Sequence, residues 1–329
     1  MVTPIKAIVL FSGGLDSILA VKLLQEQGIE PIAYTFQTPF FGPESAIQAN
    51  KYLDIPIKIW EITDIYMEML KKPKYGYGKN MNPCIDCHGL MFRLAGQKMI
   101  ETGVHFLASG EVLGERPFSQ NKGALNAVAN LSQYPEYILR PLSAKLLPET
   151  LAEKSGWVDR RLLLDIQGRS RKRQMALAKK YGIAKYPKPA GGCRLTEPNF
   201  SKRLKELFIH TPNPSLSDLE LLKVGRHLRW KEGSKVIVGR RREENDKIEA
   251  LAQTGDLLLW VKDIPGPNVL IPSPSQPVEA LLKFAAGAAI RYSDAPACQK
   301  IDVIYTDGKE QGQITTEACR EEEIQEFLL

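Results

Sequence analysis

Cysteine and long hydrophobic runs are both scarce in this sequence. It has five cysteines in 329 residues, and so small and odd a number excludes a disulfide scaffold and favours a reducing cytosol. The most apolar stretch, residues 277–290, is interrupted by Glu279 and Lys283, so it predicts an amphipathic helix and no membrane span. The chain enters a strand-like segment at Ile5–Phe11 without a charged-then-apolar leader. We therefore expect a cytoplasmic protein with no membrane partner.

Two common nucleotide-binding patterns are also missing. The chain has no G-x-x-x-x-G-K-[ST] and no G-x-G-x-x-G, which argues against ordinary P-loop kinases and GTPases and against dinucleotide enzymes. Its composition is that of a globular protein, with 43% apolar and 25% charged residues. The length is sufficient for two domains, each with its own core.

Acidic residues are depleted in one region. Residues 1–210 carry 29 Lys and Arg against 19 Asp and Glu, whereas residues 211–329 carry 15 against 19. Within residues 154–205 the count is 15 basic to 3 acidic. Such a block attracts a polyanion by counterion release, although a solvated basic face without a partner explains the charge equally well.

The first half of the chain alternates between strand and helix signals. Short apolar runs predict strands at residues 7–10, 31–36, 57–62 and 106–108. Helical spacing predicts helices at 18–27, 44–52, 64–71, 90–102, 149–155, 169–180 and 200–206, with a loop at 72–83. Alternation of this kind requires crossover connections and predicts an α/β fold with a doubly wound parallel sheet.

The pattern changes after Thr211–Asp218, whose sequence TPNPSLSD has the composition of a linker. We therefore predict a catalytic domain over 1–210 and a second domain over 218–329. In the second domain, strand signals at 235–239, 257–261, 268–271 and 301–305 are combined with helix signals at 277–290 and 316–327. This is the pattern of a smaller α+β domain.

A glycine-rich hexapeptide, Ser12-Gly13-Gly14-Leu15-Asp16-Ser17, stands between the first predicted strand and its helix. Gly13 and Gly14 permit a tight turn whose N–H groups face a phosphate, and the helix N-terminus adds positive charge. Ser12 and Ser17 add hydroxyl donors, and Asp16 can hold Mg²⁺ or orient a pyrophosphate. Turn and N-cap chemistry alone is the alternative explanation.

Three cysteines form a second constellation, in the segments Cys84-Ile85-Asp86-Cys87-His88 and Gly191-Gly192-Cys193-Arg194. Three thiolates can hold three irons of a [4Fe–4S] cluster and leave the fourth open, which makes Cys84, Cys87 and Cys193 candidate metal ligands. Two alternatives remain: persulfide chemistry between two of the cysteines, or structural zinc with His88 as a further ligand. Cys298 and Cys319 fall outside this pattern and are predicted core residues.

The hexapeptide resembles the signature of the PP-loop ATP pyrophosphatases. That resemblance implies an enzyme that cleaves ATP between the α and β phosphates, with Mg²⁺, and transfers AMP to a carbonyl oxygen. It also implies that adenine lies against the end of the second strand, here Tyr34 and Phe36. The signature is shared by base-thiolating enzymes and by amide-forming ligases, so it leaves both open.

A longer segment is similar to the catalytic domain of the tRNA 4-thiouridine synthases. It comprises Ala108–Glu115, Ser119-Gln120 and Arg140-Pro141-Leu142, and with the loop and the cysteines it covers about the first 200 residues. The resemblance implies that Gly110 and Glu111 border the nucleotide. It further implies adenylation of a uracil carbonyl in tRNA, followed by attack of sulfur from sulfide or a persulfide carrier. We assign no role to Arg93 or Lys145.

The second domain resembles the RNA-binding module of the NFACT family, through Gly239–Asp246 and Leu258–Val269. The resemblance implies a module that positions RNA, with Lys262 and Asn268 on a rim and Arg240–Arg242 near phosphates. Trp260 is interpreted as a core residue in preference to a base-stacking one. A catalytically silent RNA-binding protein is the remaining alternative for the whole chain.

Overall fold

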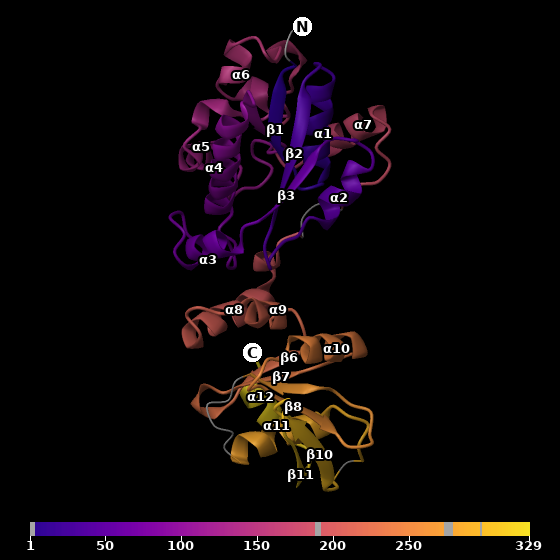
Figure 1. The fold of residues 1–329 in the computed structure, drawn as a ribbon. Coiled ribbons are helices and arrows are strands. Elements are labelled where there is room, and N and C mark those ends of the chain that lie inside the picture. Colours follow the sequence, from indigo (N-terminus) through magenta and orange to yellow (C-terminus); the bar gives the residue numbers. More distant parts are fainter. Residues whose placement is uncertain (1–3, 188–191, 273–278, 297) are drawn as a thin grey trace. The chain divides into compact units, whose positions relative to one another are not determined.

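The chain folds into two compact units, Met1–Thr196 and Glu197–Leu329 (Figure 1). Each unit is held together by contacts between its own residues. The structure is a computed structural model that describes residues 4–187, 192–272, 279–296 and 298–329. Gly191 and the predicted helix start at Pro277 lie outside these ranges. Over the described residues, every helix is too short or too polar to cross a membrane.

The first unit is built on a parallel sheet of five strands in the order β3-β2-β1-β4-β5. Its strands are β1 Lys6–Leu10, β2 Glu30–Gln37, β3 Ile57–Glu61, β4 Phe106–Ser109 and β5 Ile138–Leu139. The central strand is apolar because it is covered on both faces: Ala7, Ile8 and Val9 are fully buried. The predicted doubly wound α/β fold is confirmed.

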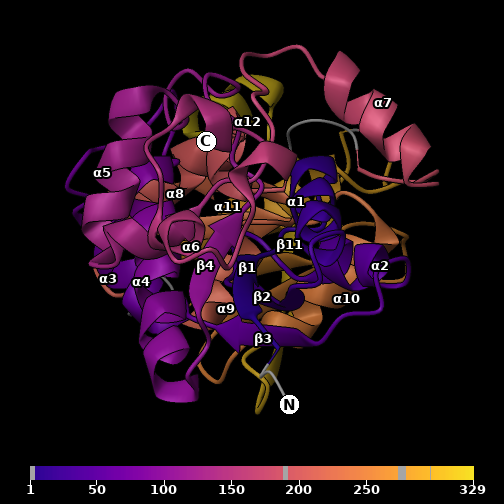
Figure 2. The same cartoon turned by 90° about the horizontal axis from the view of Figure 1, so that it is seen from above.

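Helices cover both faces of this sheet, as Figure 2 shows from above. One face carries α3 Thr63–Lys71, α4 Cys84–Thr102 and α5 Lys122–Ser132, and the other carries α1 Leu15–Gln25, α2 Glu44–Asn50 and α7 Lys172–Lys180. A short helix, α6 Leu151–Lys154, begins with a capping box at Thr150 and Glu153. The fold thereby places the N-termini of α1 and α4 near the carboxyl ends of the strands.

The strand order reverses between β1 and β4. The chain runs outward from β1 to β2 and β3, then returns to pair β4 with the opposite side of β1. In open α/β sheets the crevice outside the carboxyl ends of the strands at such a point is the usual ligand position. The hexapeptide that follows β1 and the segment Gly110-Glu111 that follows β4 both lie at this point.

The second unit contains an antiparallel sheet of six strands in the order β11-β10-β8-β9-β7-β6. The strands are β6 Arg226–Arg229, β7 Lys235–Val238, β8 Leu257–Val261, β9 Val269–Ile271, β10 Ile301–Thr306 and β11 Gln311–Thr316. Alternate residues of β8, namely Leu257, Leu259 and Val261, enter the main core, as the period of two requires.

The helices of this unit are α8 Pro198–His210, α9 Leu216–Leu221, α10 Arg242–Leu251, α11 Glu279–Arg291 and α12 Glu321–Phe327. The small residues of α11, including Ala285, Gly287 and Ala288, pack closely against the sheet. On the other face, Ile248 of α10 packs with Ile237 and Leu270. The α+β character predicted for this region is confirmed.

The structure differs from the sequence interpretation in several elements. The division between units falls at Thr196/Glu197, so α8 belongs to the second unit, and the linker-like segment 211–218 holds the turn into α9 and its capping box at Ser215 and Asp218. The helix expected at 90–102 begins already at Cys84. Strands β5, β6 and β11 and helices α5, α9 and α10 were not predicted; the strands and α9 have only two to six residues each.

Candidate active site

The hexapeptide forms the turn from β1 into α1. Gly13 has a φ of +74°, and a Cβ built there would lie 2.2 Å from the backbone oxygen of Ser45, so only glycine fits. The Ser17 hydroxyl donates to the Gly14 carbonyl at 2.8 Å, and the Gly14 N–H donates to Ser12 Oγ at 3.3 Å. The loop is thus ordered as an anion cradle at the N-terminus of α1.

The segment after β4 contacts this loop directly. A Cβ on Gly110 would lie 2.4 Å from the backbone nitrogen of Ser17 and 2.4 Å from the carbonyl carbon of Asp16. The two backbones approach each other so closely because position 110 has no side chain. Gly110 is therefore part of the wall of the hexapeptide loop, where the predicted nucleotide border lies.

Asp16 faces polar groups from α7 and from the loop after β4. Burial raises the pKa of this carboxyl, while the guanidinium groups of Arg171 and Arg116 and the Gln174 amide lower it in part. Asp16 Oδ1, Arg171 Nε and both amide atoms of Gln174 are buried and make no hydrogen bond with the described residues. Buried polar atoms without partners are rare in folded proteins. Their convergence on Asp16 indicates a site for a polar ligand.

The cysteine pair lies in the first turn of α4. Cys84 is half-buried and Cys87 is buried. The Asp86 carboxylate between them accepts hydrogen bonds from the backbone N–H groups of Lys74 and Tyr75, at 2.7 and 3.0 Å. The Asn82 amide donates to Cys84 Sγ at 3.3 Å. These bonds hold the loop 72–83, predicted as a loop, over the start of the helix.

Cys193 is brought to this pair by two long-range hydrogen bonds. The Arg194 N–H donates to the Phe40 carbonyl at 2.9 Å, and the Asn80 amide donates to the Thr196 carbonyl at 2.7 Å. Cys193 and Cys84 both lie close enough to Cys87 to raise the pKa of its thiol. The three cysteines thus lie in one neighbourhood.

Tyr66 completes the cysteine cluster. This residue of α3 is buried, and its hydroxyl lies beside the Cys87 thiol, near Cys193 and Cys84. Burial, with the two other cysteines, raises the pKa of Cys87 well above its ordinary value. Burial and the same cysteines likewise raise the pKa of Tyr66. Both groups are accordingly neutral at physiological pH.

A buried ion network joins the cysteine helix to the nucleotide loop. Glu111 Oε1 accepts from His88 Nδ1 at 2.7 Å, and Oε2 accepts from Arg140 Nε at 2.8 Å. Burial raises the pKa of Glu111, but Arg140 and His88 outweigh it and hold the pKa at about 2. Because Gly110 touches the hexapeptide and His88 follows Cys87, this network places the cradle and the cysteines in one neighbourhood.

The other predicted nucleotide contacts occupy different environments. Tyr34 and Phe36 are buried and pack edge-on against Trp60, with ring centroids 5.1 and 5.8 Å apart from it. Their rings therefore belong to the layer over the sheet. Lys145 donates to the Arg161 carbonyl at 2.8 Å and is exposed.

The expectation of a metal centre at Cys84, Cys87 and Cys193 finds no support. Across the described residues, which include all five cysteines, no three His, Cys, Asp or Glu side chains are arranged to hold a metal ion. Neither the [4Fe–4S] cluster nor structural zinc is therefore supported by the arrangement of these side chains.

Several predictions for the second unit need correction. Arg240 is exposed and its guanidinium is paired with Glu244, Nε to Oε2 at 2.9 Å, which the sequence did not predict. Trp260 lies on the face of β8 opposite to Leu257, Leu259 and Val261 and is half-buried, so it is no core residue. Cys298 is exposed, whereas Cys319 packs partly against the core.

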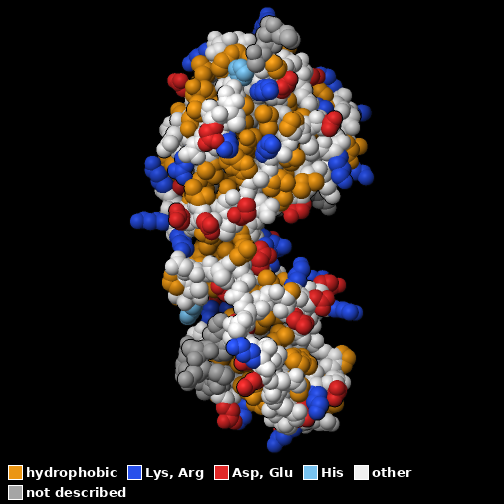
Figure 3. All heavy atoms as spheres, in the orientation of Figure 1, with side chains coloured by type: hydrophobic (Ala, Val, Ile, Leu, Met, Phe, Trp, Pro, Cys, Tyr) orange, Lys and Arg blue, Asp and Glu red, His pale blue; other side chains and the backbone are white. Residues whose placement is uncertain are grey.

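The surface charges are mixed. On the face drawn in Figure 3, Lys and Arg side chains are interspersed with Asp and Glu in each unit and form no single basic patch on that face. Some arginines of the basic block form ion pairs with acids of the same unit: Arg160 with Glu153 at 2.5 Å and Arg173 with Asp165 at 2.6 Å. The Arg171 guanidinium instead interacts electrostatically with the Asp16 carboxyl of the hexapeptide and lowers its pKa.

Sequence reasoning missed Tyr66, Arg116, Arg171 and Gln174. No local motif marks them, because they reach the site from three separate parts of the fold: α3, the loop after β4, and the start of α7. The basic run at 154–205 was a signal for Arg171, but it did not distinguish this residue from its neighbours.

Two family models describe the chain. Residues 5–156 match the tRNA methyl transferase HUP domain, and residues 225–328 match the NFACT protein RNA binding domain. Residues 5–156 are thus similar to a HUP domain, and residues 225–328 to an NFACT-type RNA-binding domain. The match over residues 225–328 agrees with the NFACT resemblance inferred from the sequence.

Curated relatives are tRNA-specific 2-thiouridylases MnmA. That of Caldicellulosiruptor saccharolyticus is 23% identical over 222 residues, which is 61% of this chain and 59% of that protein. That of Clostridium botulinum strain Eklund 17B is 32% identical over 124 residues, 32% of this chain and 34% of that protein. The chain thus spans less than two thirds of the length of these relatives.

Two solved structures were also found to be similar. A 4-thiouridine synthetase–RNA complex with bound ATP has a TM-score of 0.40 and 18% identity, covering 65% of this chain and 52% of that one. The C-terminal part of a fibronectin/fibrinogen-binding protein from Streptococcus suis has a TM-score of 0.30 and 13% identity, covering 81% of this chain and 97% of that one.

Proposed function

We propose that the chain is an ATP-dependent tRNA uridine sulfurtransferase that adenylates a uracil carbonyl and replaces its oxygen by sulfur. The observation that carries this proposal is the contact series from Asp16 and Ser17 through Gly110 and Glu111 to His88, beside Cys87. This series supports a triphosphate cradle near the three cysteines. The similarity to tRNA-specific 2-thiouridylases supports the same chemistry.

The triphosphate of ATP would be bound by Ser12–Ser17. Its oxygens would supply partners for Arg171 and Gln174, whose buried polar atoms lack them in the described structure. Mg²⁺ commonly uses one or two carboxylates together with substrate phosphates, so Asp16 Oδ1 and the triphosphate suit it. Bound Mg²⁺ would offset the phosphate charge. Adenylation converts the carbonyl oxygen into a good leaving group, released as AMP.

The cysteines would deliver the sulfur. One of the pair Cys87 and Cys193 would carry a persulfide, whose terminal sulfur attacks the activated carbon as AMP leaves. The other thiolate would then attack the remaining sulfur, and the product is a thiocarbonyl and a Cys87–Cys193 disulfide. A thiol reductant would restore the cysteines. A persulfide carrier would be the donor: the cysteine thiolate attacks the outer sulfur of the carrier, and the carrier's own thiol leaves. Sulfide could serve only by attacking the Cys87–Cys193 disulfide, which forms the persulfide on one cysteine and releases the other as a thiolate. The cytoplasm would be the compartment.

The second unit would position the tRNA. Its match to an NFACT protein RNA binding domain supports this role, as do Arg241 and Arg242, whose side chains are exposed at the start of α10. Arg240, held by Glu244, would instead fix the turn that presents them. Half-buried Trp260 has an open face available for a base.

The decisive experiment is nucleoside mass spectrometry of tRNA incubated with the protein, ATP, Mg²⁺, a persulfide donor and a thiol reductant. We expect a thionucleoside and stoichiometric AMP. Cys87→Ala and Cys193→Ala should abolish the thionucleoside, while Cys298→Ala, an exposed cysteine outside the cluster, should not. AMP formation that continues with an amide product, or full thiolation by the Cys87→Ala variant, would disprove the proposal.

A further inference from the structure

Lys235, the first residue of β7, is a buried lysine whose amine has no partner among the described residues. The residue is 9% exposed. Over the residues that the structure describes, its amine makes no hydrogen bond and no ion pair, although Glu206 and Asp218 lie within electrostatic range. Burial and the neighbouring Arg229 and Arg203 lower the pKa of Lys235 to about 8, despite the opposing effect of those two acids. A buried ammonium group is costly unless it is paired.

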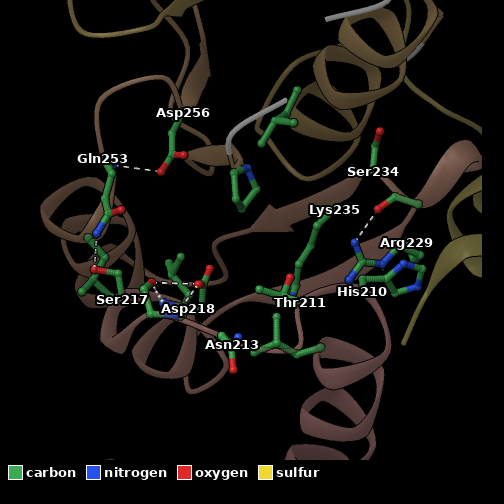
Figure 4. Close-up of a pocket in the computed structure, with 17 residues that line it drawn as sticks. His210, Thr211, Asn213, Ser217, Asp218, Arg229, Ser234, Lys235, Gln253 and Asp256 are labelled. Atoms are coloured by element: carbon green, nitrogen blue, oxygen red, sulfur yellow. Dashed lines mark hydrogen bonds between the residues drawn. The ribbon is translucent and has the colours of Figure 1, made fainter. Parts of the chain in front are cut away.

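The amine faces a polar cavity of about 460 Å³ within the second unit (Figure 4). The walls come from the turn between α8 and α9, from β6 and β7, and from the loop before β8. Among its lining residues are Thr211, Asn213, Ser217, Ser234 and Gln253. Such a size lies within the range of small-molecule and cofactor sites. Hydroxyl and amide groups therefore surround the lysine.

A second cation lines the same cavity. Arg229 Nε is paired with Glu206, but Arg229 Nη2 is buried and makes no hydrogen bond with the described residues. In Figure 4, Arg229, His210 and Ser234 lie on one side and Gln253 and Asp256 on the other, with Lys235 between them. Two donors with unmet hydrogen-bonding capacity thus belong to adjacent strands of one wall.

The two acids that line the cavity already accept hydrogen bonds from backbone N–H groups and a hydroxyl. Asp218 accepts from the N–H and the hydroxyl of Ser215, at 2.8 and 2.7 Å, in the cap of α9. Asp256 accepts from the Gln253 N–H at 2.9 Å. Both carboxylates thus already accept hydrogen bonds at the cavity edge. Donors of the cations that line the cavity still lack an acceptor among the described residues, and an anion would supply one.

We propose that this cavity binds the phosphate of a single nucleotide, with the phosphate at Lys235 and Arg229 and the base or sugar among the hydroxyls and amides opposite. A phosphate supplies charge-assisted acceptors for the Lys235 amine and for Arg229 Nη2, which have none among the described residues. A cavity of about 460 Å³ has room for a single nucleotide but not for a duplex backbone. The nucleotide is either free in solution or the phosphorylated end of an RNA strand. The site is separate from the proposed thiolation chemistry.

The test is calorimetric titration of the full chain, with a non-hydrolysable ATP analogue present at saturation to fill the first unit. The ligands are uridine, uridine 5′-monophosphate, and tetrauridylate with and without a 5′-phosphate. We expect binding only of phosphorylated ligands. Binding of the mononucleotide identifies a free nucleotide, and binding of the phosphorylated tetramer alone identifies an RNA end. Equal affinity for uridine and its monophosphate, or no binding at all, would overturn the proposal.

Lys235→Met is the informative variant, and Lys300→Met is its control. Lys300 is an exposed lysine of the same unit, away from the cavity, so its replacement makes the same charge change. We expect Lys235→Met to weaken phosphate binding at least tenfold and to leave the melting temperature equal or higher, because an unpaired buried charge is removed. Lys300→Met should change neither. Unchanged binding by Lys235→Met would refute the assignment.

Discussion

At the scale of single residues, the site depends on groups whose chemistry is set by burial. Cys87 lies in the first turn of α4, where an exposed thiol would be activated by the helix N-terminus. Burial and the two neighbouring cysteines have the opposite effect and raise its pKa. The thiol is thus kept unreactive until a substrate or sulfur donor changes its surroundings.

This assignment predicts an order of alkylation. With iodoacetamide at pH 7, exposed Cys298 should be modified first and Cys87 last, since the thiolate is the reacting species. The rate at Cys87 should continue to rise above pH 9, because its pKa lies well above the ordinary value. Peptide mass spectrometry over time measures both. Modification of Cys87 at pH 7 as fast as that of Cys298 would contradict the burial argument.

Gly110 gives a second prediction for a single residue. Gly110→Ala places a Cβ 2.4 Å from Asp16 and Ser17 backbone atoms, so the loop must move away from its phosphate-binding geometry. We expect AMP formation to fall at least tenfold, on the scale that small displacements cost. Gly123→Ala, on exposed helix α5, is the control, since its Cβ would meet only a side-chain oxygen, at 3.3 Å. Wild-type turnover by Gly110→Ala would show that the contact is not required.

At the scale of elements, α4 and β4 are joined by Glu111, which links His88 of the helix to Arg140 after β5. Both oxygens of the Glu111 carboxylate accept hydrogen bonds, so Glu111 connects α4 to the segment after β5. Removing it leaves the Arg140 guanidinium, 7% exposed, without its counter-charge. Breaking one side of a buried pair is far more costly than losing a surface pair.

Glu111→Gln should therefore lower the free energy of unfolding by about 3–5 kcal/mol. In the wild type the pKa is about 2 when folded against 4.5 ordinarily. The stabilisation is then present above pH 4.5 and is lost as pH falls towards 2, and it amounts to about 3 kcal/mol. Urea unfolding at pH 7, 4.5 and 3 should show this loss in the wild type and a flatter profile in the variant. Parallel profiles would assign the acid sensitivity to other groups.

Helix α7 contributes Arg171, which precedes it, and Gln174 to the Asp16 surroundings. Arg171→Met should raise the KM for ATP at least tenfold, because a charge-assisted phosphate contact is lost. Lys172→Met, an exposed neighbour, should leave KM unchanged. Steady-state AMP release measures both variants. Equal KM values would remove α7 from the nucleotide site.

At the scale of the whole molecule, the two units have separate cores. Residues 197–329 expressed alone should unfold cooperatively in a thermal melt followed by circular dichroism, and should bind tRNA in a filter assay. Residues 1–196 should form AMP from ATP but bind tRNA at least tenfold more weakly than the full chain does. If tRNA affinity stayed wholly with residues 1–196, the second unit would not be the RNA-positioning module.

The sequence by itself determined the parallel sheet, the hexapeptide cradle and the cysteine trio, because local signals encode them: apolar runs define strands, and glycines mark close backbone approach. Only the tertiary structure identified Tyr66, Arg171, Gln174 and the Lys235 cavity, and only it revealed the lack of metal-ligand geometry at the cysteines. Those features depend on which side chains from distant elements meet and how deeply they are buried. Burial decides the protonation of Cys87 and Lys235, and residue type alone does not encode it.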